Sequence, residues 1–121
     1  MAEMATYIGI EPRTVTANAA VSRGQRVTLN SSGTVDVQDN TAAGDYVAIT
    51  DIEAGKVGEV ASMSGGGKVP ALASEATNVG DLAYTATTGR FSKTSTSNVA
   101  VGRWVLAASG AGVLGEVELG V

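Results

Sequence analysis

Short runs in which apolar and polar residues alternate make up most of this 121-residue chain. In residues 57–61 (VGEVA) and 116–119 (EVEL), the polar side chains fall on one face of an extended strand, as in a half-buried antiparallel sheet. The runs are rich in Val, Ile and Thr and are bounded by Gly, Asn, Asp and Ser, a pattern typical of short strands joined by tight turns. The predicted strands are Thr14–Ala17, Gln25–Asn30, Thr34–Val37, Tyr46–Ile49, Val57–Ser62, Lys68–Ala71, Leu82–Thr85, Phe91–Lys93, Val101–Ala107 and Leu114–Leu119. Helical patterning is weak, and predicts single helical turns at most, at 41–44 and 73–77.

Turn-forming residues stand between several of these strands. The segments 30–33 (NSSG) and 86–89 (ATTG) each separate two strands and end in glycine, as in ordinary β-hairpins. A third glycine-rich turn, residues 64–67 (SGGG), predicts another hairpin.

Two parts of the chain resemble each other. Residues 44–60 (GDYVAITDIEAGKVGEV) and 102–117 (GRWVLAASGAGVLGEV) share a glycine, an aromatic residue, a valine and a closing Gly-Glu-Val. Upstream, Gly24 and Gly33 have the same separation as Gly80 and Gly89. A fixed internal period indicates a duplicated structural unit.

We therefore expect an all-β fold, a compact small barrel or sandwich of short antiparallel strands built from two similar halves. Residues 17–121 would form one domain, with halves at about 17–72 and 73–121, and two weakly coupled lobes are the alternative. Residues 1–16 contain no hairpin and are predicted to be an extended N-terminal arm. Its apolar residues Met4, Tyr7, Ile8 and Ile10 suit docking on another surface, for example by strand addition, although a frayed terminus is also consistent with them.

Composition excludes several kinds of chemistry. The chain has no cysteine and no histidine, so disulfides, thiolate or imidazole metal sites and Ser-His-Asp or Cys-His catalysis are impossible. The net charge of −4, the absence of a Lys/Arg cluster and the few aromatic residues argue against nucleic-acid binding. No apolar run approaches a membrane span, and the acidic N-terminus is unlike a signal peptide, so we expect no membrane partner and synthesis in the cytosol.

Few residues suggest a ligand site. Residues 64–68 (SGGGK) resemble a phosphate-binding loop, but no Ser or Thr follows the lysine and no helix is predicted there. The acidic residues Asp36, Asp39, Asp45, Asp51 and Glu53 match no calcium-loop spacing and are better explained as turn residues. Paired carboxylates of a glycosidase would need a cleft with aromatic residues, for which this sequence provides little. We therefore expect no enzyme activity, no cofactor and no metal.

The repeated positions have structural explanations. Glu59 and Glu116 occupy equivalent places in the two halves and are expected on the exposed face of a strand. Tyr46 and Trp104 are also equivalent and are expected to pack in the core, with an interface role as the alternative.

The order of motifs resembles the capsid cement, or head decoration, proteins of tailed bacteriophages. The similarity lies in Ala19-Ala20-Val21-x-x-Gly24-x-x-Val27-x-Leu29, in Gly33-x-Val35, and in Ala54-Gly55 before Gly58-Glu59-Val60. It continues from Val79-Gly80 to Gly115-Glu116-Val117 and so covers roughly residues 12–121. Tyr46-Val47-Ala48-Ile49 stands where the family often has Gly-x-Ala or Gly-Val-Ala.

The resemblance implies a structural virion protein on the outside of the expanded head, present in the host cytoplasm during assembly. Such proteins typically form homotrimers and clamp neighbouring major capsid subunits, with no catalysis. Their N-terminal arm commonly contacts the capsid, a role that would fall to Met4, Tyr7, Ile8, Ile10 and Arg13. The alternatives left open are a phage tail or baseplate adaptor and a receptor- or glycan-binding β module, the latter expected to expose aromatic residues.

Overall fold

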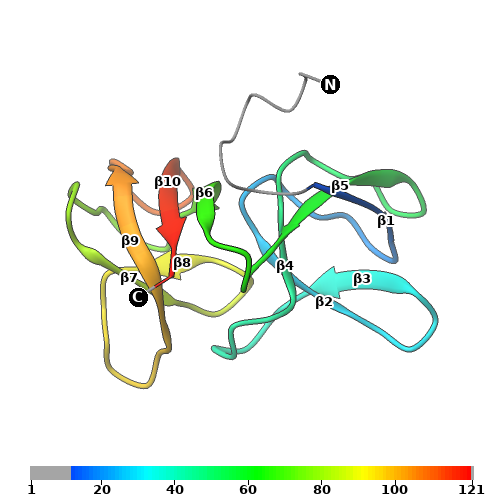
Figure 1. Ribbon diagram of the computed structural model, residues 1–121, viewed down its shortest axis with the longest axis horizontal. Coiled ribbons are helices and arrows are strands. Elements are labelled where there is room, and N and C mark those ends of the chain that lie inside the picture. The colour runs from blue at the N-terminus through cyan, green and yellow to red at the C-terminus, as the bar shows by residue number, and fades with distance from the viewer. Residues whose placement is uncertain (1–11, 121) are drawn as a thin grey trace.

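The computed structural model describes residues 12–120, which fold entirely into strands, turns and loops. A closed five-stranded barrel is followed by a five-stranded sheet, and the two lie side by side (Figure 1). The barrel strands are β1 (Arg13–Ala17), β2 (Arg26–Leu29), β3 (Thr34–Val37), β4 (Tyr46–Ala48) and β5 (Val57–Ser62). The second sheet contains β6 (Gly67–Leu72), β7 (Leu82–Thr85), β8 (Phe91–Ser92), β9 (Ala100–Leu106) and β10 (Leu114–Leu119).

The all-β prediction is confirmed, and every predicted strand is present with ends that agree to within one residue. The helical turns predicted at 41–44 and 73–77 are wrong, since these residues form bends, turns and loops. The hairpins at 30–33 and 86–89 join β2 to β3 and β7 to β8 as antiparallel pairs.

The third predicted hairpin, at 64–67, is wrong. The strand before it, β5, pairs with β1 and β4, whereas the strand after it, β6, pairs with β10. The glycine-rich turn therefore carries the chain from the barrel to the second sheet. The boundary between the sheets lies here, before the predicted division between residues 72 and 73.

The two sheets share one order of pairings. In the barrel, antiparallel pairs run β1–β5–β4–β2–β3, and a parallel β1–β3 pair closes the ring. In the second sheet they run β6–β10–β9–β7–β8, and Ala73, just after β6, makes a parallel bridge to Phe91 in β8. Internal duplication stays a prediction, and this order of pairings is what it would produce.

Two pairs of glycines at equivalent positions also have similar backbones. Gly24 and Gly80 have φ of 88° and 96°, and Gly55 and Gly112 have φ of 77° and 79°. These values lie in the left-handed region that glycine adopts without a steric penalty. Each half therefore needs glycine at the same turns, which explains the spacing seen in the sequence.

The apolar core continues from one sheet into the other. One cluster lies inside the barrel and includes Val27, Val35 and Val60. The larger cluster joins barrel residues such as Val47 to Trp104 and other residues of the second sheet. Trp104 is fully buried, and its indole N–H donates to the Ser92 carbonyl oxygen at 3.1 Å. Its ring meets that of Phe91 edge to face at 6.4 Å, so the predicted core role of Trp104 is confirmed.

A buried arginine holds the barrel against the second sheet. The Arg26 guanidinium, in β2, donates to carbonyl oxygens of Asn40, Ala42 and Ala43 in the β3–β4 loop and of Ala86 and Arg90 in the second sheet. It also lies 5.8 Å from the centroid of the Phe91 ring. Desolvation by burial lowers the pKa of Arg26 to about 10, so the group is charged at neutral pH.

We use "seam" for the junction of the two sheets around β2 and the β7–β8 turn. Hydrogen bonds to the backbone of this turn also hold the seam together. The Arg26 N–H donates to Gly89 O at 2.7 Å, and Gln25 Nε2 donates to Thr88 O at 2.9 Å. A Cβ on Gly89 would meet the Arg26 carbonyl oxygen at 2.8 Å, so this close approach requires glycine.

Candidate binding surfaces

The described residues present shallow hollows and exposed apolar patches and no deep cleft lined by reactive side chains. Three hollows have volumes of about 230, 350 and 160 Å³. Two of these fall below the roughly 300–1,000 Å³ of typical small-molecule sites. The exposed surfaces of the described residues are therefore the candidate binding features.

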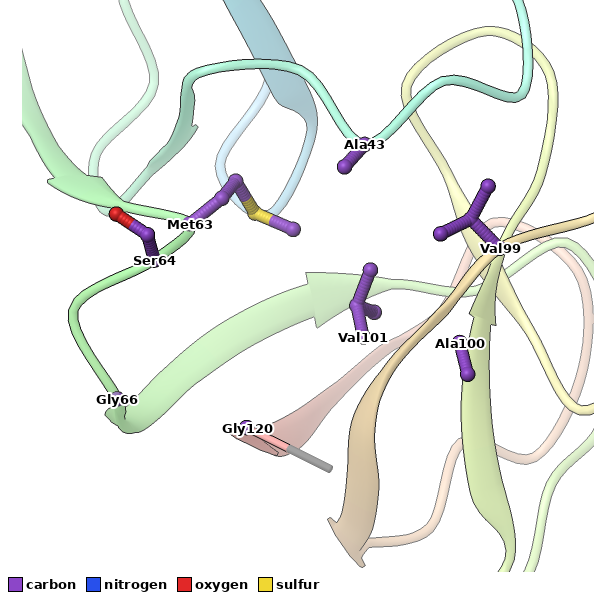
Figure 2. Close-up of a pocket in the computed structure, with 8 residues that line it drawn as sticks. All are labelled: Ala43, Met63, Ser64, Gly66, Val99, Ala100, Val101 and Gly120. Carbon is purple, nitrogen blue, oxygen red and sulfur yellow. The ribbon is translucent and has the colours of Figure 1, made fainter.

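The first surface is an apolar groove at another part of the junction between the two sheets, formed by the β3–β4 loop, the turn after β5 and the start of β9. We use "seam groove" for the hollow lined by Ala43, Met63, Ser64, Gly66, Val99, Ala100, Val101 and Gly120, with a volume of about 230 Å³. Figure 2 shows the side chains of Ala43, Met63, Val99 and Val101 converging on one space. Val101 is buried, whereas Val99 is 46% exposed. The groove can accept one or two aliphatic side chains.

The second surface is the outer face of the second sheet, where exposed leucines gather. Leu82, Leu106 and Leu114 are 38%, 51% and 39% exposed. Leu106 and Leu114 line one hollow together with Arg23 and Pro70. Val79 and Val113, in the adjoining turns, are exposed as well. We call these five residues the leucine face.

Charged residues lie beside the leucines. Lys68, Glu118 and Arg103 stand opposite one another on β6, β10 and β9, and Leu82 pairs with Arg103. Because paired residues share a face of a sheet, this face carries both apolar area and both signs of charge. An exposed patch of this kind suits protein contact.

The remaining hollow, with a volume of about 350 Å³, does not favour sugar binding. It is lined by Thr41, Ser74, Glu75, Ala86, Thr87, Ser92, Thr94 and Asn98, and none of these is aromatic. The aromatic candidates for stacking on a sugar are in the core, since Trp104 is fully buried and Tyr46 is 9% exposed.

The sequence-predicted contact residues lie at the start of the chain. Met4, Tyr7, Ile8 and Ile10 fall outside the described residues. Arg13 opens β1, where its Nη1 donates to the Tyr46 hydroxyl oxygen at 2.6 Å and its guanidinium lies 5.3 Å from the centroid of that ring. Residues 13–16 of the predicted arm thus belong to the barrel, and the role of all five residues in binding stays a prediction.

The acidic residues are spread over separate turns. Asp45 accepts hydrogen bonds from Thr28 Oγ1 and the Leu29 N–H, Asp51 from the Arg23 N–H, and Asp36 from the Asn18 and Asn30 side chains. Within residues 12–120, no three such residues come close enough to hold a metal ion. The same part of the chain has no helix of the length and apolarity needed to span a membrane.

Neither surface was identified from the sequence. Met63 and Val99 are 36 positions apart (99 minus 63) and meet because the turn after β5 packs beside the start of β9. For the leucine face a local signal exists, since Leu114 lies on the same side of β10 as Glu116 and Glu118, which is the polar side of the strand.

Comparison with known proteins gives matches of two kinds, to a family model and to solved structures. A sequence model of the family described as "Phage cement protein" matches residues 10–119. The head fiber gp8.5 N base of bacteriophage phi29 has a similar structure, with a TM-score of 0.69 over 92% of this chain and 94% of that one. The two chains are 20% identical, so this second match concerns the fold. A search of curated proteins gave no match.

Proposed function

This chain belongs to the phage cement protein family and is a structural, head-associated virion protein, and we propose that it stabilises the expanded head by clamping neighbouring major capsid subunits. It would bind the outer surface of the shell and reach it from the host cytoplasm during assembly. The family match over residues 10–119 carries this proposal.

The described surfaces suit such a role. A clamp has to transmit force without deforming, and the continuous core and the Arg26 contacts join the two sheets into one unit. The leucine face offers apolar contact area together with Lys68, Glu118 and Arg103. Interfaces of this type combine an apolar centre with a polar rim.

We further propose that the chain acts as a homotrimer and contacts the capsid through the arm residues Met4, Tyr7, Ile8, Ile10 and Arg13. Binding of three sites at once raises the overall affinity through effective concentration, even when each single contact is weak. Hydrophobic residues two apart, such as Ile8 and Ile10, lie on one side of an extended segment and can enter a groove on a partner together.

The test is co-sedimentation with expanded heads that lack this protein. We expect the full chain to bind saturably, at a fixed ratio to the major capsid subunit, and a chain that begins at Pro12 to bind much more weakly. The matched control is Val57→Ser, which changes an exposed barrel residue far from the arm's apolar side chains in sequence and leaves the arm intact. Absence of binding by the full chain would refute the head-clamping proposal, and equal binding by the truncated chain would refute the role of the arm. Sedimentation equilibrium of the free protein tests the trimer.

A further inference from the structure

The seam groove lies close to the start of β1, because Met63, which lines the groove, is three residues beyond Val60, the partner of Arg13. β1 is antiparallel to β5, with Arg13 opposite Val60 and Thr14 opposite Glu59. If this register continued for three more residues, Ile10 would stand opposite Met63, because each step back in β1 is one step forward in β5. Met63 is one of the side chains that converge in the groove (Figure 2).

The hydrogen-bonding pattern allows the strand to continue past Pro12. Ala17 N–H donates to Lys56 O at 3.0 Å, and bonded positions alternate along an antiparallel ladder, so the odd-numbered residues of β1 are those that bond to β5. Pro12, which has no N–H, therefore falls where β5 needs no donor. The residue before a proline is biased to extended backbone, which favours a straight continuation through Glu11.

Most side chains that line the groove are apolar, like those of Ile8 and Ile10. Its convergent side chains are aliphatic or thioether groups, and Val99 leaves 46% of its surface exposed there. Ile8 and Ile10 would lie on one side of an extended segment, and five residues span about 17 Å from Arg13 to Ile8. A tethered segment this short has an effective concentration in about the millimolar range, so modest apolar contact is enough to keep it docked.

We propose that the seam groove is the docking site of residues 8–10 of the same chain in the free protein. The segment extends β1 along the end of β5, sets Ile10 against Met63 and places Ile8 in the groove beside Val99. The groove and the head surface then compete for the same apolar residues. Docking of residues 8–10 in the groove concerns the isolated protein, so it can be tested without phage heads and independently of the proposed function.

Because the chain has no cysteine, engineered cysteine pairs test the contact directly. The test pair is Ile8→Cys with Val99→Cys. The control pair is Ile8→Cys with Val57→Cys, since Val57 is opposite Thr16 in the register and, at 63%, is more exposed than Val99. A segment without a docking site samples both positions. Both variants are first compared with the parent by thermal melting under reducing conditions.

Under mild oxidation at low micromolar concentration, we expect the test pair to form an intramolecular disulfide at least ten times faster than the control pair. Equal rates would overturn the proposal. A covalent dimer whose yield rises with protein concentration would also overturn it, because the segment would then dock on another copy.

Protease sensitivity provides a second readout without cysteines. Chymotrypsin cleaves after Tyr7, next to the proposed docking residues. Val99→Asp, which places a charge in the groove, should speed this cleavage several-fold, as followed by mass spectrometry. Val57→Asp should leave it unchanged. An unchanged cleavage rate in Val99→Asp would contradict the proposal.

Discussion

Replacing Arg26 by methionine tests the most distinctive interaction of this fold. The substitution keeps a long, flexible side chain and removes the guanidinium. The carbonyl oxygens of Ala42 and Ala86 lose their donor, and so do the more distant ones of Asn40 and Ala43, at 3.4 and 3.3 Å. The Arg90 carbonyl oxygen keeps the Ala86 N–H at 2.9 Å. Because Arg26 has no exposed surface, water cannot replace these hydrogen bonds without opening the seam.

The expected loss follows from the number of acceptors. Each buried acceptor left without a partner costs about 1–3 kcal/mol. The two closely bonded carbonyls, of Ala42 and Ala86, would together cost about 2–6 kcal/mol, partly offset because a charge no longer has to be desolvated. We expect the free energy of unfolding to fall by about 3–5 kcal/mol, a large part of the roughly 5–15 kcal/mol typical of a domain.

Urea denaturation, followed by circular dichroism, measures this loss. The matched control is Arg103→Met, since Arg103 is exposed and its Nη1 donates to Gly80 O at 2.7 Å on the surface. This substitution should cost less than about 1 kcal/mol. A loss below about 1 kcal/mol for Arg26→Met would refute the reasoning, because the hydrogen bonds from Arg26 to the buried carbonyl oxygens would then contribute little to stability.

A second check on Arg26 is the pH dependence of the difference in free energy of unfolding between the parent protein and Arg26→Met. Desolvation by burial lowers the pKa of Arg26 from the ordinary arginine value to about 10 on folding. Below pH 9 the group is protonated in both the folded and the unfolded state, so the difference between parent and Arg26→Met should be constant at pH 5, 7 and 9. Above pH 10 the folded state binds fewer protons than the unfolded state, and stability rises with pH. A change above about 1 kcal/mol between pH 5 and 9 would contradict this assignment.

Two further predictions concern packing and cooperativity. Gly102→Ala should lower the free energy of unfolding, measured by urea denaturation, by about 3 kcal/mol, because the added Cβ would overlap the Glu118 carbonyl. The control Gly110→Ala has open space around its Cβ and should change the free energy of unfolding by less than about 0.5 kcal/mol. Similar losses in the two variants would contradict the packing described. Fluorescence of Trp104, the single tryptophan, should report the same urea midpoint as far-UV circular dichroism, because the core and seam join both sheets; separate midpoints would indicate two independent lobes.

The sequence predicted the local structure well and the assembly of the two sheets poorly. Strand ends could be predicted because alternation and turn glycines are local signals, as in Val57–Ser62. The partner of β6 could not, because nothing in Gly67–Leu72 distinguishes a return strand beside β5 from a strand beside β10. The parallel β1–β3 pair that closes the barrel is likewise set by three-dimensional packing.

The candidate surfaces were harder still to predict. Arg26 stands between Gln25 and Val27 in an ordinary strand pattern, and its acceptors lie 14–64 positions away. Sequence reasoning placed the binding function in the arm, whereas the groove and the leucine face require knowledge of which strands are neighbours. The family resemblance identified the class of protein because it depends on the order of whole motifs and not on single contacts.

The hydrogen bonds of the Arg26 guanidinium also affect the order in which parts of the protein can fold during synthesis. Its acceptor in Arg90 lies 64 positions further along the chain. At about 5–20 residues per second, a ribosome needs roughly 3–13 s to make that intervening stretch. During this time Arg26, which is buried in the folded protein, lacks two of its five carbonyl acceptors, those of Ala86 and Arg90. The first half therefore cannot reach its final state alone, and the nascent chain completes its barrel only when the β7–β8 turn has been made.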